Sequence, residues 1–264
     1  MKKSLTLTLI LVTLVTLFVH AQTKPVYALV AFHKLKPGHT IDEAMAMENK
    51  WKTIQKIRKE AGLITNWGVY TIVNGHKTPS IDFDYMSVNF SSDLNTISVY
   101  PMDKYTALVA KDLSFANIVE ETAKIQTISY SNTSKKIDGT PSANDLNSIL
   151  SMEVFKTSLP NYFNYVEFEK QMKNIHLDRI AAGEIQEWSF WQTVAPLADD
   201  SKGQFTAFTS YKDYAHIDAP IGTTIDSAKK RMNLTPDQLL KKMDGLRSMT
   251  QNALMKYTVG TFGE

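Results

Sequence analysis

Two histidines and a pair of aspartates are the side chains of this sequence best suited to acid–base chemistry. His176 lies in a stretch with helical apolar spacing, and His33 lies in a β-branched and aromatic stretch. Imidazole titrates near neutral pH and coordinates metals, so either ring can act as a general base or an axial ligand. Asp82 and Asp84 alternate along a third stretch, where carboxylates on one face can share a proton. His176 and Asp84 are therefore the candidate catalytic residues, against the alternatives of a buried structural histidine and an exposed strand edge.

Aromatic side chains recur along the segments predicted to be strands. Side chains of a strand alternate between its two faces, so Trp67 and Tyr70 point to opposite sides, and so do Trp188 and Trp191. Either face of each segment thus carries a large ring, with core packing as the alternative role. The candidate ligand-binding residues are Trp67, Tyr70, Tyr85, Trp188, Trp191 and His33.

Several classes of chemistry have no support in the sequence. It contains no cysteine, which excludes disulfides and thiolate metal sites. It has no G-x-S-x-G nucleophile motif, no phosphate-binding glycine loop and no dinucleotide fingerprint. The histidines lack the close spacing to carboxylates that is typical of zinc sites, so neither a metal nor a cofactor is predicted.

The elements that must position these residues occur twice. At an offset of 121 residues, Glu48–Val73 matches Glu169–Val194 at nine of 26 positions, and Trp67 aligns with Trp188. Each half contains a strand, a long helix, two strands, a further helical region and a last strand. The first helix begins after Thr40, with Glu43 completing a capping box, and it ends at Gly62. Glu48 and Glu169 are expected to form i,i+4 pairs with Lys52 and Lys173 on the helix surface.

The order β-α-β-β-α-β, repeated, predicts the fold class α+β, with two tandem ferredoxin-like repeats. One such unit leaves one face of its sheet bare, and a second copy can cover it. We therefore predict that the repeats pack sheet to sheet as an intramolecular α/β barrel with a space between them. The predicted domains are residues 22–130 and 148–264, joined by a polar linker at 131–147. Within the first half, a helix is expected over about 102–115 and a third strand over 81–90.

The N-terminal residues are predicted to be an export signal. Two lysines precede an apolar run, and the Val-His-Ala that follows fits a signal peptidase site, so residues 1–21 are predicted to be removed before Gln22. The run is short for a membrane span and contains several threonines. We expect a periplasmic or secreted protein with no membrane span after cleavage.

The balance of charge excludes one class of partner. The net charge of +2 includes two leader lysines, so the mature chain is close to neutral and has no dense basic run. A nucleic-acid partner is therefore not expected. A homodimer is compatible with the sequence, and the predicted partner is a small apolar or aromatic molecule.

Three stretches carry a resemblance to a known superfamily: "ALVAFHKLKPG", "WKTIQKIRKEAGLITNWGVYTI" and "FDYMSVNF". They resemble the dimeric α/β-barrel superfamily, which includes antibiotic-biosynthesis-monooxygenase-like, EthD-like and NIPSNAP-like domains, and they are similar to uncharacterised secreted bacterial proteins. The secreted bacterial proteins share the motif W-K-x-I-H-x-x-R-x-x-A-G. In this chain the histidine position of the motif is Gln55 in the first half and His176 in the second. The resemblance implies the fold over nearly the whole mature chain and leaves the activity open.

Three functions follow as hypotheses. The first is an exported protein that binds a small apolar or aromatic molecule between its two repeats. The second is a cofactor-independent oxygenase or isomerase that uses His176 with Trp188 or Asp84. The third is a haem-associated protein with His176 or His33 as the iron ligand.

Overall fold

The computed structural model describes residues 24–100, 115–142, 145–196, 204–217 and 222–263. Its strands are β1 (Tyr27–Leu35), β2 (Asn66–Lys77), β3 (Tyr85–Ser91), β4 (Gln126–Gly139), β5 (Ile149–Lys156), β6 (Glu187–Ala195), β7 (Phe205–Tyr211) and β8 (Ser248–Gly260). Its helices are α2 (Ile41–Glu60), α4 (Phe115–Ile125), the short 3-10 helix η2 (Leu159–Asn161), α5 (Tyr162–Ala181), α6 (Tyr214–Ile217), α7 (Gly222–Met232) and α8 (Pro236–Leu246).

All eight strands close into one antiparallel barrel in the order β1-β3-β2-β8-β5-β7-β6-β4. The first half of the chain contributes β4-β1-β3-β2 and the second half contributes β8-β5-β7-β6, so the strand order is the same in both halves and is that of a ferredoxin-like sheet. The predicted mixed fold with a barrel is thereby confirmed. The halves meet edge to edge, through β4–β6 and β2–β8 pairing, and not as two separate sheets stacked face to face.

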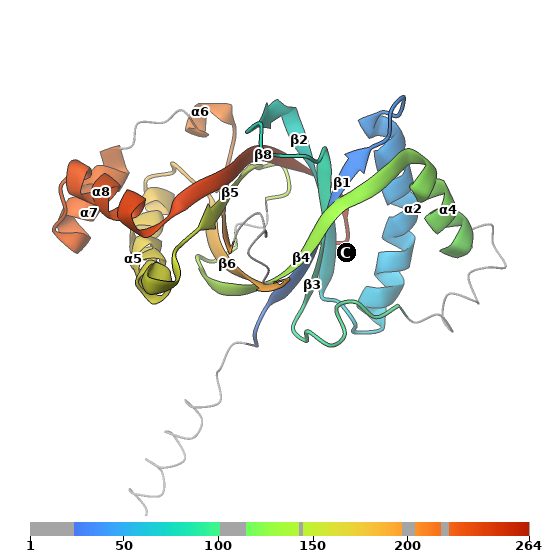
Figure 1. Ribbon diagram of the computed structural model, residues 1–264, viewed down its shortest axis with the longest axis horizontal. Helices are drawn as coiled ribbons and strands as arrows, with labels where there is room; N and C mark the ends of the chain where they lie inside the picture. The colour runs from blue at the N-terminus through green and yellow to red at the C-terminus, as the bar shows by residue number, and fades with distance from the viewer. Residues whose placement is uncertain (1–23, 101–114, 143–144, 197–203, 218–221, 264) are drawn as a thin grey trace, which may run out of the picture.

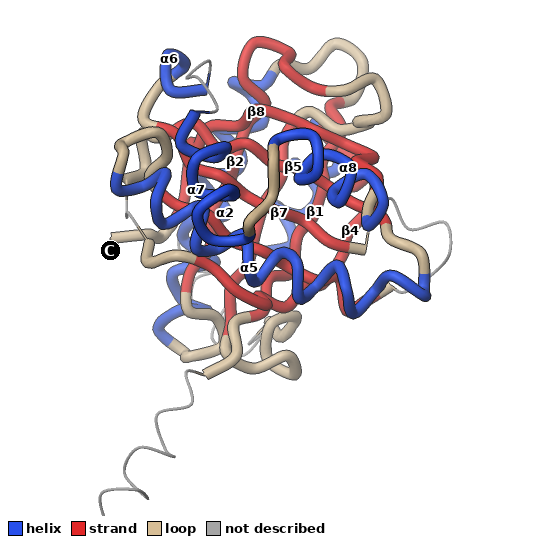
Figure 2. Tube along the Cα trace, turned by 90° about the vertical axis from the view of Figure 1, so that its left-hand side faces the viewer, coloured by secondary structure: helices blue, strands red, loops and turns tan. Residues whose placement is uncertain are grey.

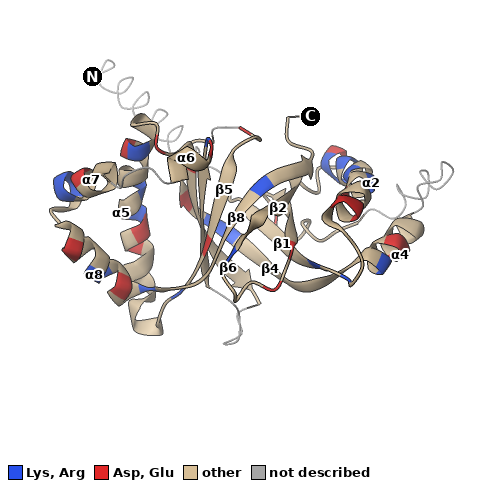
Figure 3. Ribbon diagram, turned by 90° about the horizontal axis from the view of Figure 1, so that it is seen from above, with Lys and Arg blue, Asp and Glu red and all other residues tan. Residues whose placement is uncertain are grey.

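The helices lie outside the barrel, on opposite sides. Figure 1 shows α2 and α4 against the first half and α5, α7 and α8 against the second. Figure 2 looks onto the second group, whose helices cross in front of the strands. In Figure 3 the charged residues concentrate on these helices, with few on the strands between them. Each helix group therefore buries one face against the sheet and presents charge to solvent.

The ends of the long helices follow the local sequence. Thr40 caps α2 in a capping box with Glu43, as predicted. Gly62 and Gly183 follow α2 and α5 with φ of 70° and 74°, a left-handed conformation that costs glycine little. Thr235 caps α8, which begins with Pro236, a residue well suited to the first helical position.

The polar segment at 131–147 differs from the expected linker, because β4 continues to Gly139. Thr133–Gly139 pairs with Ala195–Ser189 of β6, and the same strand pairs with β1 on its other side. Two flanking strands satisfy its backbone, so this stretch forms a strand without an apolar face.

The third strand and the second helical region also have shifted bounds. β2 extends to Lys77 and β3 begins only at Tyr85, so residues 78–84 cross one end of the barrel. α4 spans Phe115–Ile125; most of the helix expected at 102–115 lies outside the described residues.

We predict that Gly260→Ala destabilises the barrel at its β2–β8 closure. A Cβ at Gly260 would lie 2.5 Å from the carbonyl oxygen of Trp67 and 2.9 Å from Cα of Gly68. Because these are backbone atoms of the paired strand, relief requires the strands to separate, at a cost of about 2 kcal/mol of unfolding free energy. Thermal unfolding measures this. Gly245→Ala, in α8 with open space around it, is the control and should leave stability unchanged or slightly raised; equal melting temperatures for the two variants would contradict the prediction.

Candidate functional site

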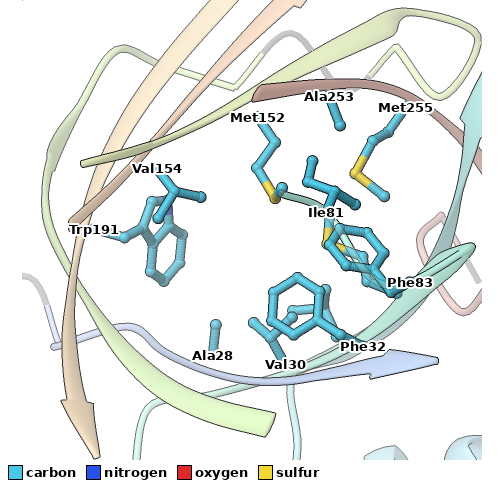
Figure 4. Packing of buried hydrophobic residues seen from close by; sticks show 12 residues of the cluster. Ala28, Val30, Phe32, Ile81, Phe83, Met152, Val154, Trp191, Ala253 and Met255 are labelled. Carbon is cyan, nitrogen blue, oxygen red and sulfur yellow. The ribbon is translucent and has the colours of Figure 1, made fainter. Parts of the chain in front are cut away.

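The barrel encloses a cavity of about 560 Å³, within the size range of small-molecule sites. Its apolar wall comes from alternate residues of β1, β3, β5, β6 and β7, and polar residues gather toward one end. Figure 4 shows Trp191 from one wall and Ala28, Val30 and Phe32 from another pointing into this interior. The apolar lining residues are Val26, Ala28, Val30, Phe32, Met86, Val88, Phe90, Leu146, Leu150, Met152, Trp191, Phe208 and Phe262.

One end of the barrel is closed by side chains. Residues 78–84 cross it, and Ile81 and Phe83 are buried beneath the crossing. The Phe32 ring lies 4.7 Å from Phe83 and 4.2 Å from Tyr130 between ring centroids. This cluster forms the apolar floor of the cavity.

The other end is lined by polar side chains from loops and strand ends. They come from the start of β2, the β4–β5 connection, β6 and β7, and the chain end at Phe262 and Gly263 also lies here. The polar residues lining the cavity are Thr65, Asn66, Asn132, Ser134, Lys136, Ser142, Asp145, Ser148, Glu187, Ser189, Thr206 and Ser210, with Tyr70 and Tyr257. The cavity is therefore polar at its mouth and apolar at its floor.

Aromatic rings contact one another around the wall. Trp191 lies 6.0 Å from Phe90, which lies 5.8 Å from Phe262. Tyr257 packs edge-on against both Phe262 and Tyr70 at 5.7 Å. Burial raises the pKa of Tyr70 well above its usual range, so its phenol stays protonated. Trp191 donates from Nε1 to Oγ of Ser189 at 2.9 Å.

Among the sequence-predicted ligand residues, Tyr70 and Trp191 line the cavity. Trp67 and Trp188, three residues earlier, face the opposite way and pack beneath the helices with about 1 % of their surface exposed. The odd spacing within each pair places the rings on opposite faces, as alternation requires.

Tyr85 and His33 belong to a buried network beneath α2 and do not line the cavity. The Tyr85 hydroxyl donates to Oε1 of Glu48 at 2.7 Å and also contacts the side-chain amide of Gln126. His33 stacks on Tyr85 with 4.5 Å between centroids and bonds through Nε2 to Ser87 at 2.8 Å. Burial lowers the pKa of His33 to about 4, so the ring is neutral at physiological pH. Glu48 is buried here, in contrast to the surface pairing expected for it.

His176 is on α5, at the position that Gln55 holds on α2, and its ring faces the sheet. Its ring stacks on Trp188 with 4.6 Å between centroids. Burial, followed by the charges of Arg179 and Arg247, lowers its pKa to about 3. Glu169 is also buried on α5, with Oε1 3.6 Å from Nη1 of Arg247. The imidazole therefore packs between helix and sheet, outside the cavity.

Asp84 lies at the closed end of the barrel. Its Oδ2 accepts a hydrogen bond from the backbone of Leu35 at 2.9 Å, and its Oδ1 lies 3.6 Å from Lys34 Nζ and 3.5 Å from Lys77 Nζ. Lys34 also pairs with Asp82 at 3.6 Å, so a cation neutralises both aspartates. Neither aspartate lines the cavity.

Sequence reasoning missed the residues from β4 and β8 that line the cavity. Asn132, Ser134 and Lys136 alternate along β4, but both faces of that strand are polar, so periodicity gave no signal there. Tyr257 and Phe262 come from the C-terminal strand and its extension. Alternation could not have assigned Tyr257 to the cavity, because Val259, two residues on, packs under α2 and the β2–β8 register shifts between them.

Two searches of the described residues concern metals and membranes. No group of three or more histidines and carboxylates there is placed to hold a metal ion. None of the described helices combines the length and the apolar character that a membrane span requires.

The sequence matches no protein-family model and no curated protein. Solved structures are similar to it in fold. A protein provisionally assigned as a chlorite dismutase is 12% identical with a TM-score of 0.51, over 90% of this chain and 96% of that one. A protein from Lactobacillus acidophilus provisionally assigned as a monooxygenase is 10% identical with a TM-score of 0.52, over 91% and 97%. A haem-binding protein from Thermus thermophilus is 12% identical with a TM-score of 0.47, over 90% and 92%. The first two show that the whole barrel architecture is shared.

The buried carboxyl of Glu48 predicts a pH-dependent stability. Burial raises its pKa from 4.5 to about 7, against hydrogen bonds from Tyr85 and Gln126 that lower it. The folded state then holds a proton that the unfolded state releases, so stability falls as pH rises from about 4.5 to about 7. Glu48→Gln should remove this loss, which is on the order of 3 kcal/mol. Urea unfolding across this pH range measures it. Glu60→Gln, exposed at the end of the same helix, should follow the wild type; a Glu48→Gln curve parallel to wild type would refute the assignment.

Proposed function

We propose that this protein binds a small, largely apolar or aromatic molecule inside its barrel. The observation that carries the proposal is the cavity of about 560 Å³, floored by Phe32, Met86 and Met152 and bordered by polar side chains at its mouth. Apolar walls with a few convergent polar groups are the usual composition of small-molecule sites.

The two halves contribute unlike groups to this site. Tyr70 and Trp191 occupy equivalent positions at the 121-residue offset, on β2 and β6, and both line the cavity. We infer that the chain is a tandem repeat, with residues 22–130 and 148–264 as its units. A phenol on one wall and an indole on the other favour a flat ligand with a preferred orientation over a symmetric one.

The placement of the histidines does not favour the enzymatic or haem-associated alternatives. His176 packs between α5 and the sheet, and Asp84 is held by Lys34 and Lys77 at the closed end of the barrel; neither lines the cavity. A haem in the cavity would need an axial ligand, and the described lining residues include no histidine. His33 and His176 are held against Tyr85 and Trp188 in filled helix–sheet interfaces. These residues do not fit a histidine-ligated haem.

Filling the cavity tests the binding proposal. Ala28 lines it and is 4 % exposed, so Ala28→Phe places a ring where the ligand would lie. We expect the affinity for the neutral dye N-phenyl-1-naphthylamine, measured by its fluorescence increase, to fall about tenfold or more. Ala46→Phe, the same change on the exposed surface of α2, should bind the dye like the wild type.

Two further outcomes decide between the proposal and its rivals. Equal dye binding by Ala28→Phe, Ala46→Phe and wild type would place the dye elsewhere and contradict the proposed site. His176→Phe retains a ring against Trp188 and should leave dye binding unchanged. Loss of dye binding at an unchanged melting temperature would show that His176 takes part in binding.

We also propose that the protein is exported after removal of residues 1–21. The support is the sequence alone: two lysines, an apolar run and a compact cleavage site. Intact-mass measurement of the protein from its own host should give a chain beginning at Gln22, in the periplasmic or extracellular fraction. A chain that keeps the leader, recovered with the cytosol, would overturn this proposal.

A further inference from the structure

Three polar residues of β4 form a stripe inside the barrel, which we call the β4 stripe: Asn132, Ser134 and Lys136. They alternate along the strand, so all three side chains face the cavity. The register places Ser134 beside Ala28 and Asn132 beside Val30, both of which are apolar. The stripe therefore runs inward from the mouth along an otherwise apolar wall.

The fold leaves one polar atom of this stripe without a partner. Oδ1 of Asn132 is buried and has no hydrogen-bond partner among the described residues. Burying a polar group unpaired costs free energy that an apolar side chain at the same position would avoid. Asn132 thus lowers stability unless a polar group that is not part of the protein pairs with its Oδ1.

Lys136 is the cation of the site. It is the only basic residue among the described residues that line the cavity, and Asp138, two residues along the strand, forms its ion pair with Lys173. Its Nζ lies 6.0 Å from the centre of the Trp191 ring. Gly139 leaves it room, since a Cβ there would lie 2.7 Å from Cε of Lys136.

The two carboxylates of the mouth have protein partners. Asp145 accepts from Nε2 of Gln186 at 2.9 Å and from the backbone of Asn147 at 2.9 Å, and these bonds lower its pKa. Glu187 accepts from the Ser142 hydroxyl at 2.8 Å. On β6, Glu187 is four residues from Trp191, roughly 13 Å along the strand toward the mouth. The acids border the entrance, while Lys136 is level with Trp191 in the β4–β6 register.

We propose that the ligand is an amphipathic carboxylic acid whose anionic group pairs with Lys136 while its apolar body lies along the wall toward Met86 and Met152. The inference rests on the proposed binding function and names its ligand class. An ammonium that is partly shielded from water and held above an aromatic face pairs strongly with a carboxylate. Asn132 and Ser134 lie deeper on the same strand, where they can bond to a second polar group of the ligand.

The test compares two ligands of equal size that differ in charge. Decanoate and decanamide are each titrated against N-phenyl-1-naphthylamine bound to the purified full-length mature protein at neutral pH, and the displacement curves give their dissociation constants. We expect decanoate to bind about tenfold tighter than decanamide, the effect of one charge-assisted contact. Lys136→Met should reduce this preference to about twofold or less, and Lys136→Arg should keep most of it.

Lys135 supplies a matched control. It is adjacent on the same strand but exposed, on the outer face. Lys135→Met removes the same charge from the protein and should leave the preference for decanoate unchanged. Thermal unfolding of each variant verifies that the barrel is intact.

Each remaining outcome has a distinct meaning. If decanoate and decanamide bind equally, or if Lys135→Met lowers the preference as much as Lys136→Met, the carboxylate inference is overturned and the binding cavity stands. Tighter binding of decylamine than of decanoate would assign recognition to Glu187 and Asp145 and would equally overturn it. If no compound displaces the dye and the dye itself does not bind, the proposed function fails and the inference fails with it.

Discussion

Closure of the barrel by two strand pairings is the constraint on which the rest of this structure depends. β4 pairs with β6 and β2 pairs with β8, so the last strand of each half joins the second strand of the other. These pairings satisfy the backbone groups at both edges of each sheet, which would otherwise be unpaired. They also turn the bare faces of the two sheets toward a common interior. The close backbone approach at Gly68 and Gly260 is a consequence of this closure.

Because the inner faces of both sheets line the barrel interior, helices must cover their outer faces. α2 and α5 each bury a glutamate, and each helix also shields a tryptophan of the neighbouring strand. Burial disfavours the charged forms of the groups trapped there, which explains the raised carboxyl pKa of Glu48 and the lowered imidazole pKa of His33 and His176. Shifted pKa values therefore mark packing in this protein, although they often accompany catalytic sites.

The interior follows a different rule from the helix-covered faces. A barrel core made only of apolar side chains would be filled, and here residues 78–84 and Phe32 fill one end. Toward the other end, serines, Asn132 and Lys136 replace large apolar residues and leave space. The barrel thus supplies a cavity closed at one end, and the polar residues of β4 make part of its wall polar.

The order of elements, the capping of α2 at Thr40, the turns at Gly62 and Gly183 and the match between the halves were all readable from the sequence, because they depend on local backbone preferences and on spacing. Alternation likewise showed that Trp67 and Tyr70 point apart. It could not say which of them faces the interior, since a strand has two faces until barrel curvature and helix packing distinguish them. Nor could it show that the polar segment after Tyr130 is a strand, because pairing with β1 and β6 holds that segment in place. The tertiary structure alone therefore decided that Trp191 and Lys136 meet in the cavity, while His176 packs outside it.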